Sequence, residues 1–166
     1  MAYFDLSSLD AVDRKTASLL GYKKIFTRSE IPVADKLDSS QPCIVRSGEA
    51  GMLSRALRRS NVLGVIIKDN ELLRMIVEEA VVNEKVICLS VHDLTCVDTR
   101  SRQRNLYRMR GLMAFAMRSK ARIALVTAAE VESCLLSSMQ MMEIAKYLGA
   151  KEEQAKKILG SLGEIP

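Results

Sequence analysis

The sequence has a single histidine and no C-x-x-C pair among its four cysteines, which excludes several kinds of site at the outset. With His92 alone, no histidine cluster can bind a metal ion and no histidine pair can shuttle protons. The cysteines also lack the short spacing of a zinc site; they are Cys43, Cys88, Cys96 and Cys134. We therefore expect no metal centre built from histidine or cysteine ligands.

A long apolar run is also missing. The longest stretches without charge, such as 123–129, have the length of a strand, far below the roughly 20 apolar residues that cross a bilayer. No basic segment followed by an apolar one opens the sequence, so we expect no signal peptide, no membrane anchor and a cytoplasmic location. Hydrophobic residues make up 48% and charged residues 27% of the 166 residues, a composition typical of one globular domain over 1–166.

Acidic residues are absent from one stretch of the chain. Between Thr99 and Ala129 the sequence has seven arginines, one lysine and no Asp or Glu. The rest of the chain carries the other 17 of the 25 Lys and Arg, against all 20 Asp and Glu. The net charge of +5 is therefore concentrated in this stretch, and concentrated positive charge favours a polyanionic partner.

This basic stretch is predicted to form an amphipathic helix over 101–122. At about 100° per residue, one face is apolar and consists of Leu106, Met109, Leu112, Met113, Ala116 and Met117. An arc of roughly 40 to 80° on the opposite side is cationic and holds Arg104, Arg108, Arg118 and Arg122. Tyr107 and Phe115 lie beside this arc, where their rings can stack on bases or on a partner protein.

A charged helix face is usually only a solvated surface. In this helix, however, no acidic residue stands three or four positions away to pair with the arginines, so their like charges repel one another in the free protein. A solvated face and a polyanion-binding face both stay open at this point.

Short apolar segments alternate with helical segments, which predicts repeated β-α-β units and a parallel sheet. The six predicted strands are 3–6, 24–27, 43–46, 62–67, 86–91 and 122–127. Besides 101–122, the predicted helices are 8–20, a helix ending near residue 59, 70–83, 137–148 and 151–159. Segment 29–42 is predicted to be a loop. Gly21 and Gly149 are expected to end two helices, and Ser137 with Gln140 to form a capping box.

Ligands of parallel α/β folds bind at the carboxyl ends of the strands, where two candidate sites lie. His92, beside Asp93, is a candidate base, although a hydrogen-bonded loop histidine is the commoner role. The loop Gly48–Gly51 can cradle a phosphate on its backbone N–H groups, but without a third glycine or a lysine an ordinary turn is favoured. A second basic patch can form from Arg46, Arg55, Arg58 and Arg59.

Several short motifs follow one another in a fixed order from about Asn83 onward. They are Val86-Ile-Cys-Leu-Ser90, Arg102-Gln-Arg-Asn-Leu106, Arg122-Ile-Ala-Leu-Val-Thr-Ala128, Leu148-Gly-Ala150, Glu153-Gln-Ala-Lys156 and Glu164-Ile165, with Phe4-Asp-Leu6 near the start. In this order the sequence resembles protein component 3 of archaeal ribonuclease P, the family of the eukaryotic thirty-kilodalton subunit. The resemblance covers about half of the chain.

This resemblance implies an α/β fold of the TIM-barrel type, related to the PHP phosphoesterases. Members of the family are generally longer, so we expect a short or incompletely closed parallel barrel. It also implies a protein subunit of ribonuclease P that binds the catalytic RNA and component 2, meets precursor tRNA indirectly and supports removal of its 5′ leader. Catalysis, with Mg²⁺, then belongs to the RNA, and no catalytic residue is expected in the protein itself.

On this hypothesis the protein needs cations that neutralise RNA phosphates, and the candidates are Arg46, Arg100, Arg102, Arg104, Arg108 and Arg118. Asn105, near the helix start, is interpreted as a cap rather than a base reader. Two alternatives stay open. One is a metal-dependent phosphoesterase of a TIM-like fold that uses His92 and the Gly48 loop. The other is a module whose arginine-rich helix binds an acidic protein partner.

Overall fold

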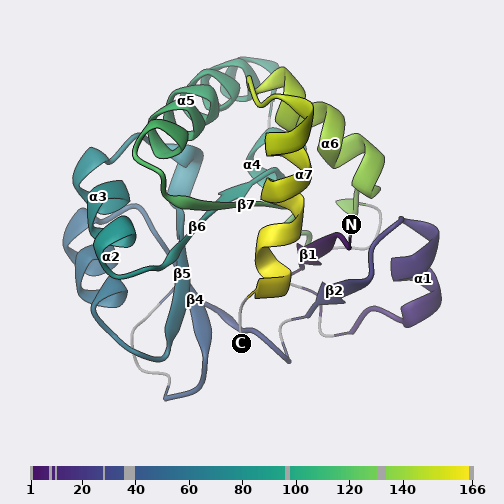
Figure 1. Cartoon of the computed structure of the whole chain (residues 1–166), viewed down its shortest axis with the longest axis horizontal. Coiled ribbons are helices and arrows are strands. Elements are labelled where there is room, and N and C mark those ends of the chain that lie inside the picture. Colours follow the sequence, from purple (N-terminus) through teal and green to yellow (C-terminus); the bar gives the residue numbers. More distant parts are fainter. Residues whose placement is uncertain are drawn as a thin grey trace.

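The computed structural model describes residues 2–7, 9, 11–27, 29–35, 40–95, 98–130 and 134–164, and shows short strands enclosed by helices (Figure 1). The strands are β1 (Phe4–Leu6), β2 (Lys24–Phe26), β3 (Val33–Ala34), β4 (Cys43–Ser47), β5 (Val62–Ile67), β6 (Val86–Ser90) and β7 (Arg122–Val126). The helices are α1 (Arg14–Leu19), α2 (Ala50–Leu57), α3 (Arg74–Val82), α4 (His92–Thr95), α5 (Thr99–Arg118), α6 (Ser138–Tyr147) and α7 (Glu152–Gly160), with 3-10 turns η1 (Lys68–Asn70) and η3 (Ser161–Glu164).

The strands form two sheets, and every pair of neighbouring strands in them is parallel. One sheet has the order β1-β2 and the other the order β3-β4-β5-β6-β7. Among the described residues these two sheets do not join into a closed barrel. The predicted α/β class with parallel strands is therefore confirmed, whereas a complete barrel is not seen.

The larger sheet is buried on both faces, because successive side chains of a strand point to opposite sides. Val65 and Leu89 belong to the apolar layer that lies between the sheet and the helices. Ile66 and Cys88 belong to a second cluster on the other face, which none of the helices α1 to α7 enters in the described chain and which Leu162 of η3 joins. Burial on two faces explains why these strands read as continuous apolar runs in the sequence.

Asp5 of β1 connects the two sheets where no strand ladder does. Its Oδ1 accepts hydrogen bonds from the backbone N–H groups of Leu6 and Thr127, both at 2.8 Å, and its Oδ2 accepts one from the Thr127 hydroxyl at 2.6 Å. Ala128 N–H adds a bond to the Leu6 carbonyl at 2.9 Å. Burial raises the pKa of Asp5 to about 6, although the bonds from Thr127 oppose that rise.

The arginine-rich helix is shorter than predicted. It spans Thr99–Arg118 instead of 101–122, because Lys120 adopts a left-handed backbone with φ of 59° and turns the chain into β7. Arg122 consequently opens a strand, and its predicted place on the helical arc is wrong. The prediction that Asn105 caps the helix is also wrong. Asp98 is the cap, and its Oδ1 accepts the N–H groups of Arg100 and Ser101 at 3.0 Å each.

The other differences concern short elements and helix starts. Segment 29–42 contains the two-residue strand β3, and the connection before α5 contains α4. The predicted helices 8–20 and 70–83 begin only at Arg14 and Arg74. Several terminal signals are confirmed: Gly21 and Gly149 follow α1 and α6 with φ of 80° and 110°, and the capping box of Ser137 and Gln140 opens α6.

Candidate nucleic-acid interface

Helix α5 is held in place by its apolar face. Met109, Leu112, Met113 and Ala116 are completely buried, and Leu106 and Met117 are half-buried, largely as the sequence predicts. Burying each large apolar side chain contributes about 2 kcal/mol, so together they fix the helix against β6 and β7. The opposite face of α5 must therefore point away from the core.

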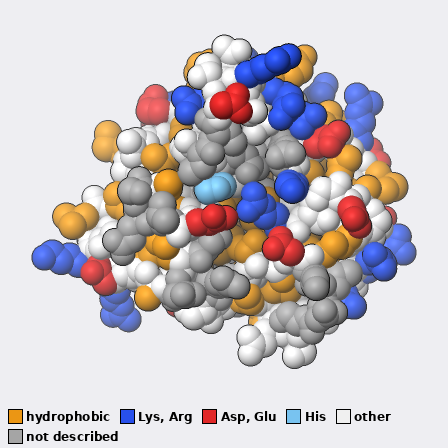
Figure 2. Space-filling model, turned by 180° about the vertical axis from the view of Figure 1, so that it is seen from behind, with side chains coloured by type: hydrophobic (Ala, Val, Ile, Leu, Met, Phe, Trp, Pro, Cys, Tyr) orange, Lys and Arg blue, Asp and Glu red, His pale blue; other side chains and the backbone are white. Residues whose placement is uncertain are grey.

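That outward face carries a row of arginines, which we call the α5 arginine arc and define as Arg100, Arg104, Arg108 and Arg118. At 100° per residue the four fall within about 80° of helix circumference, and they span about 27 Å along the helix axis. Three are exposed and Arg108 is half-buried. Lys and Arg side chains gather along the upper right edge of Figure 2, to which the 180° turn brings the helix α5 that lies at the upper left of Figure 1.

None of the four arginines forms an ion pair with Asp or Glu in the described ranges of the chain. Their guanidinium groups are thus hydrated cations that repel one another along one helix face. Such a face attracts phosphate groups, because binding releases the counterions of the polyanion while the protein loses no internal ion pair.

Arg102 is turned to another side of α5. On the helical wheel it lies about 160° from Arg104, and its Nε donates a hydrogen bond to the carbonyl of Leu94 in α4 at 2.9 Å. Arg102 is exposed, but it does not lie on the arc with the other predicted contacts. Arg110, which the prediction omitted, is exposed on a third side of the helix.

Two aromatic residues near the arc differ sharply in their surroundings. Phe115 is half-buried and lies under the guanidinium carbon of Arg74 from α3, 5.6 Å from its ring centroid. Tyr107 is 81% exposed and stands free of the core. Of these two rings, only that of Tyr107 is open to a ligand.

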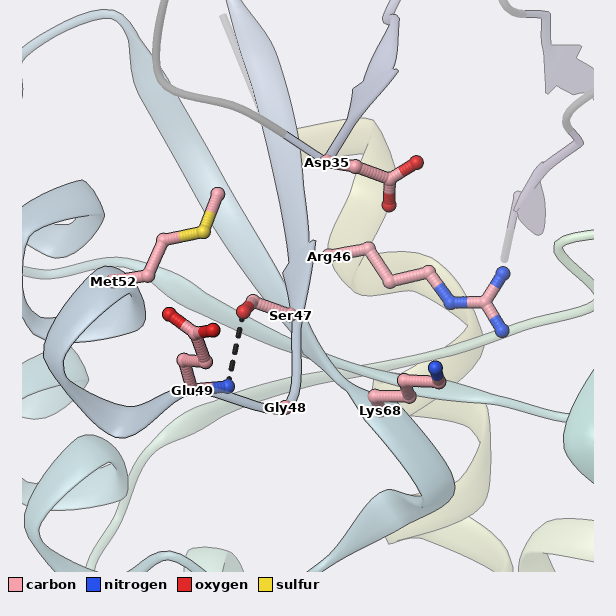
Figure 3. Close-up of a pocket in the computed structure, with 7 residues that line it drawn as sticks. All are labelled: Asp35, Arg46, Ser47, Gly48, Glu49, Met52 and Lys68. Atoms are coloured by element: carbon pink, nitrogen blue, oxygen red, sulfur yellow. Dashed lines mark hydrogen bonds between the residues drawn. The ribbon is translucent and has the colours of Figure 1, made fainter.

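Arg46 lies apart from α5, at the carboxyl end of β4, where it lines an open pocket of about 640 Å³ (Figure 3). Its side chain and that of Lys68 extend to the same side of the pocket. The carboxylates of Asp35 and Glu49 also line it, so positive and negative groups are mixed there. In the Gly48–Gly51 loop the N–H of Glu49 donates to the Ser47 hydroxyl at 3.0 Å, the arrangement of an ordinary Ser turn.

Two other residues of the predicted second basic patch have partners inside the chain. Arg58 lies at the far end of α2 and pairs with Glu79 of α3 at 3.1 Å. Arg55 donates from Nε to the carbonyl of Gly51 in its own helix at 3.2 Å. The sequence could not indicate these pairings, since Glu79 is 21 residues away from Arg58.

His92 opens α4 and is half-buried. Its backbone N–H donates to the Thr127 carbonyl at 3.1 Å, and its Nε2 lies 4.0 Å from a carboxylate oxygen of Glu130. Figure 2 shows this single histidine near the centre of one face of the molecule, beside Lys, Arg, Asp and Glu side chains. The part of the chain that the structure describes contains no group of three or more His, Cys, Asp or Glu arranged to hold a metal ion.

Two cysteines lie in strands of the larger sheet, β4 and β6. Cys43 and Cys88 are free and buried in strands, as the sequence predicts, and burial raises the pKa of Cys88 to about 12.

None of the helices in the described ranges is both long and apolar enough to span a bilayer.

Sequence reasoning assigned no role to a set of buried polar side chains at the ends of parallel strands. They are Ser7, Thr27, Asn70, Ser90 and Thr127. Asn70 donates from Nδ2 to the carbonyl of Ser90 at 3.1 Å, and Ser7 donates to the carbonyl of Ala129 at 3.1 Å. One signal in the sequence could have indicated them. Each is a polar residue at the end of an apolar segment or shortly after it.

These elements define the fold of a parallel α/β protein, and a solved structure shares this fold. A chain of "cryo-EM structure of archaeal Ribonuclease P with mature tRNA" superposes on this one with a TM-score of 0.70. The likeness covers 98% of this chain and 79% of that chain, at 15% sequence identity. At such identity it shows a common fold and no more. Neither the models of known protein families nor the curated proteins contain a match to the sequence.

Proposed function

We propose that this chain is an RNA-binding protein subunit of ribonuclease P, working as a single domain over 1–166. Two independent lines support the proposal. The fold is similar, over 98% of the chain, to a protein chain in a solved archaeal ribonuclease P with mature tRNA. The short motifs of the second half of the sequence resemble component 3 of the same ribonucleoprotein.

The observation that carries the proposal is the α5 arginine arc. It places four cationic groups on one helix face, with no ion pair to the described carboxylates. RNA offers a regular array of phosphates that such a face can neutralise. In this proposal Arg102 and Arg46 contact the RNA from separate positions, beside α4 and at the end of β4.

The proposal extends to the fold, the partners and the chemistry. We take the two sheets, linked by Asp5, as an incompletely closed barrel of the TIM type related to the PHP phosphoesterases. The partners are the ribonuclease P RNA, component 2 and other ribonuclease P proteins, and precursor tRNA indirectly, in the cytoplasm. Hydrolysis of the leader, with Mg²⁺, belongs to the RNA in this scheme.

The test is the salt dependence of RNA binding. For each phosphate contact that is lost, the slope of log Kd against log salt should shrink by about 0.7 to 0.9. We expect the variant Arg104→Ala with Arg108→Ala to lower the slope by about one to two units in titrations with ribonuclease P RNA. The matched control is Arg55→Ala with Arg58→Ala, which removes the same charge from α2.

An unchanged slope in the α5 variant would remove the arc from the RNA site. If the chain bound an acidic protein through the same arginines and showed no affinity for the RNA, this proposal would be replaced by the alternative that the arginine-rich helix binds an acidic protein partner.

A further inference from the structure

We propose that the surface around Tyr107 on α5 binds an unpaired segment of RNA, with a base stacked on the Tyr107 ring and the backbone passing over Gly111. This inference rests on the proposed function, because it names the kind of RNA element that the α5 arginine arc binds.

The first observation is the position of Tyr107. Its side chain is 81% exposed, although an aromatic ring gains considerable free energy from leaving water. It lies one helical turn after Arg104 and two turns after Arg100, so the exposed ring is on the same side of the helix as these two members of the arc. Cations that follow a backbone, with an aromatic ring on which a base can stack, are the shared features of surfaces that bind single strands.

The second observation is Gly111, in the middle of a helix of twenty residues. Glycine is the least favourable helix residue after proline, so its presence there needs a reason. Core packing does not supply one, because a Cβ at this position meets no atom within 4 Å. A missing side chain on an outward face instead allows another backbone to come close to the helix.

The geometry places this gap inside the arc. On the helical wheel Gly111, which is half-buried, lies about 20° from Arg104, and the small, exposed Ala114 follows one turn later. Tyr107 and Arg108 border the gap at one end and Arg118 at the other, about 15 Å further along the axis. A strand that crosses here finds cations at both ends of the gap and a ring at one of them.

An unpaired segment suits these features better than a duplex does. In an A-form duplex the bases are stacked on one another, and the protein meets phosphates and 2′-hydroxyl groups. Arginines alone are sufficient for such a surface. An exposed ring gains most from a base that is splayed out, which single-stranded loops and bulges provide.

The experiment compares two RNAs with the same total number of phosphates, an unstructured strand of about 16 nucleotides and a blunt-ended duplex without a loop. Binding is measured by fluorescence anisotropy at fixed salt. Tyr107→Ala should weaken binding of the unstructured strand about tenfold and leave the duplex within about twofold. Tyr107→Phe should bind as the wild type does, because stacking needs the ring and not the hydroxyl group.

A second pair of variants tests the gap. Gly111→Gln fills it with a good helix former and should weaken binding of the unstructured strand several-fold without unfolding α5. Gly111→Ala adds only a methyl group and should bind within about twofold of the wild type.

The outcomes separate this inference from the function on which it rests. If Arg104→Ala with Arg108→Ala weakens both RNAs but Tyr107→Ala affects neither, or affects both equally, the unpaired-segment inference is wrong and RNA binding by the arc stands. If the arginine variant leaves both affinities unchanged, the proposed function fails as well. Thermal unfolding at or above the wild-type temperature for each variant shows that the fold is intact.

Discussion

The cations of α5 and those of the rest of the molecule have different surroundings. Lys24 pairs with Glu30 at 2.8 Å, and Arg58 pairs with Glu79 at 3.1 Å. In the described chain, by contrast, the four members of the α5 arginine arc have no acidic partner. Exposed ion pairs contribute only about 0 to 1 kcal/mol each, so the difference is not one of stability. It shows that some cations elsewhere are neutralised by carboxylates of the chain itself, whereas the four members of the arc are available to a partner.

Charge reversal on the two helices should break this comparison most strongly. Arg104→Glu with Arg108→Glu replaces two attractions to phosphate by two repulsions, and we expect it to weaken ribonuclease P RNA binding by about 100-fold at low salt. Arg55→Glu with Arg58→Glu makes the same change in net charge on α2 and should weaken it by no more than about threefold. Filter binding at two salt concentrations measures both. Equal losses in the two variants would mean that only net charge matters.

The two faces of α5 offer a second contrast, in stability. Leu112 is completely buried, so Leu112→Ala should lower the free energy of unfolding by about 3 kcal/mol. Arg104→Ala on the outer face should change it by less than about 0.5 kcal/mol. Urea unfolding followed by circular dichroism distinguishes the two. A large stability loss in Arg104→Ala would indicate an internal role for that arginine.

The pKa of Asp5 predicts a pH dependence of the link between the sheets. Because its pKa is raised from 3.8 to about 6 by burial, the folded state holds the proton more tightly than the unfolded chain does. The stabilisation by protonated Asp5 is therefore complete below about pH 4 and is lost as the pH rises through about 6, a difference on the order of 3 kcal/mol.

Asp5→Asn is the matched control, since its amide has similar size and cannot ionise. The wild type should lose stability relative to Asp5→Asn between about pH 4 and pH 6, as measured by urea unfolding at several pH values. Parallel curves for the two proteins would show that Asp5 does not titrate in this range.

The smallest expected effect concerns Gly111. Since a Cβ there meets nothing within 4 Å, Gly111→Ala should raise the free energy of unfolding by about 0.8 kcal/mol through better helix propensity. Ala114→Gly, at an exposed position one turn later, should lower it by a similar amount. Thermal unfolding of the wild type and the two variants measures both changes in stability. A loss of stability in Gly111→Ala would show that the added methyl group disturbs the packing around Gly111.

Much of the larger sheet could be predicted from the sequence, because burial on both faces leaves a continuous apolar run. Val62–Ile67 has the predicted bounds, and three more strands of this sheet differ from prediction by a single residue at one end. The strand Val33–Ala34 was missed, since two residues give no periodicity. The end of α5 was misplaced because the helical pattern continues to Arg122, while the turn depends on the left-handed backbone of Lys120.

The candidate site was predictable in composition and not in detail. Helical periodicity gives the arc of Arg104, Arg108 and Arg118, and a count of charges shows that no local acid can pair with it. The separate orientation of Arg102 depends on the carbonyl of Leu94, which periodicity does not describe. The contact between Asp5 and Thr127 spans 122 residues, beyond the reach of any local pattern.

The most direct test of the central claim is to identify the RNA that the chain binds in its own cells. A tagged copy is purified with its nucleic acid retained, and the bound RNA is sequenced, for the wild type, for Arg104→Ala with Arg108→Ala, and for the α2 control. We predict that ribonuclease P RNA dominates the wild-type and control samples and is depleted from the α5 variant. Recovery of no enriched RNA, or of ribonuclease P RNA equally from all three proteins, would contradict the account.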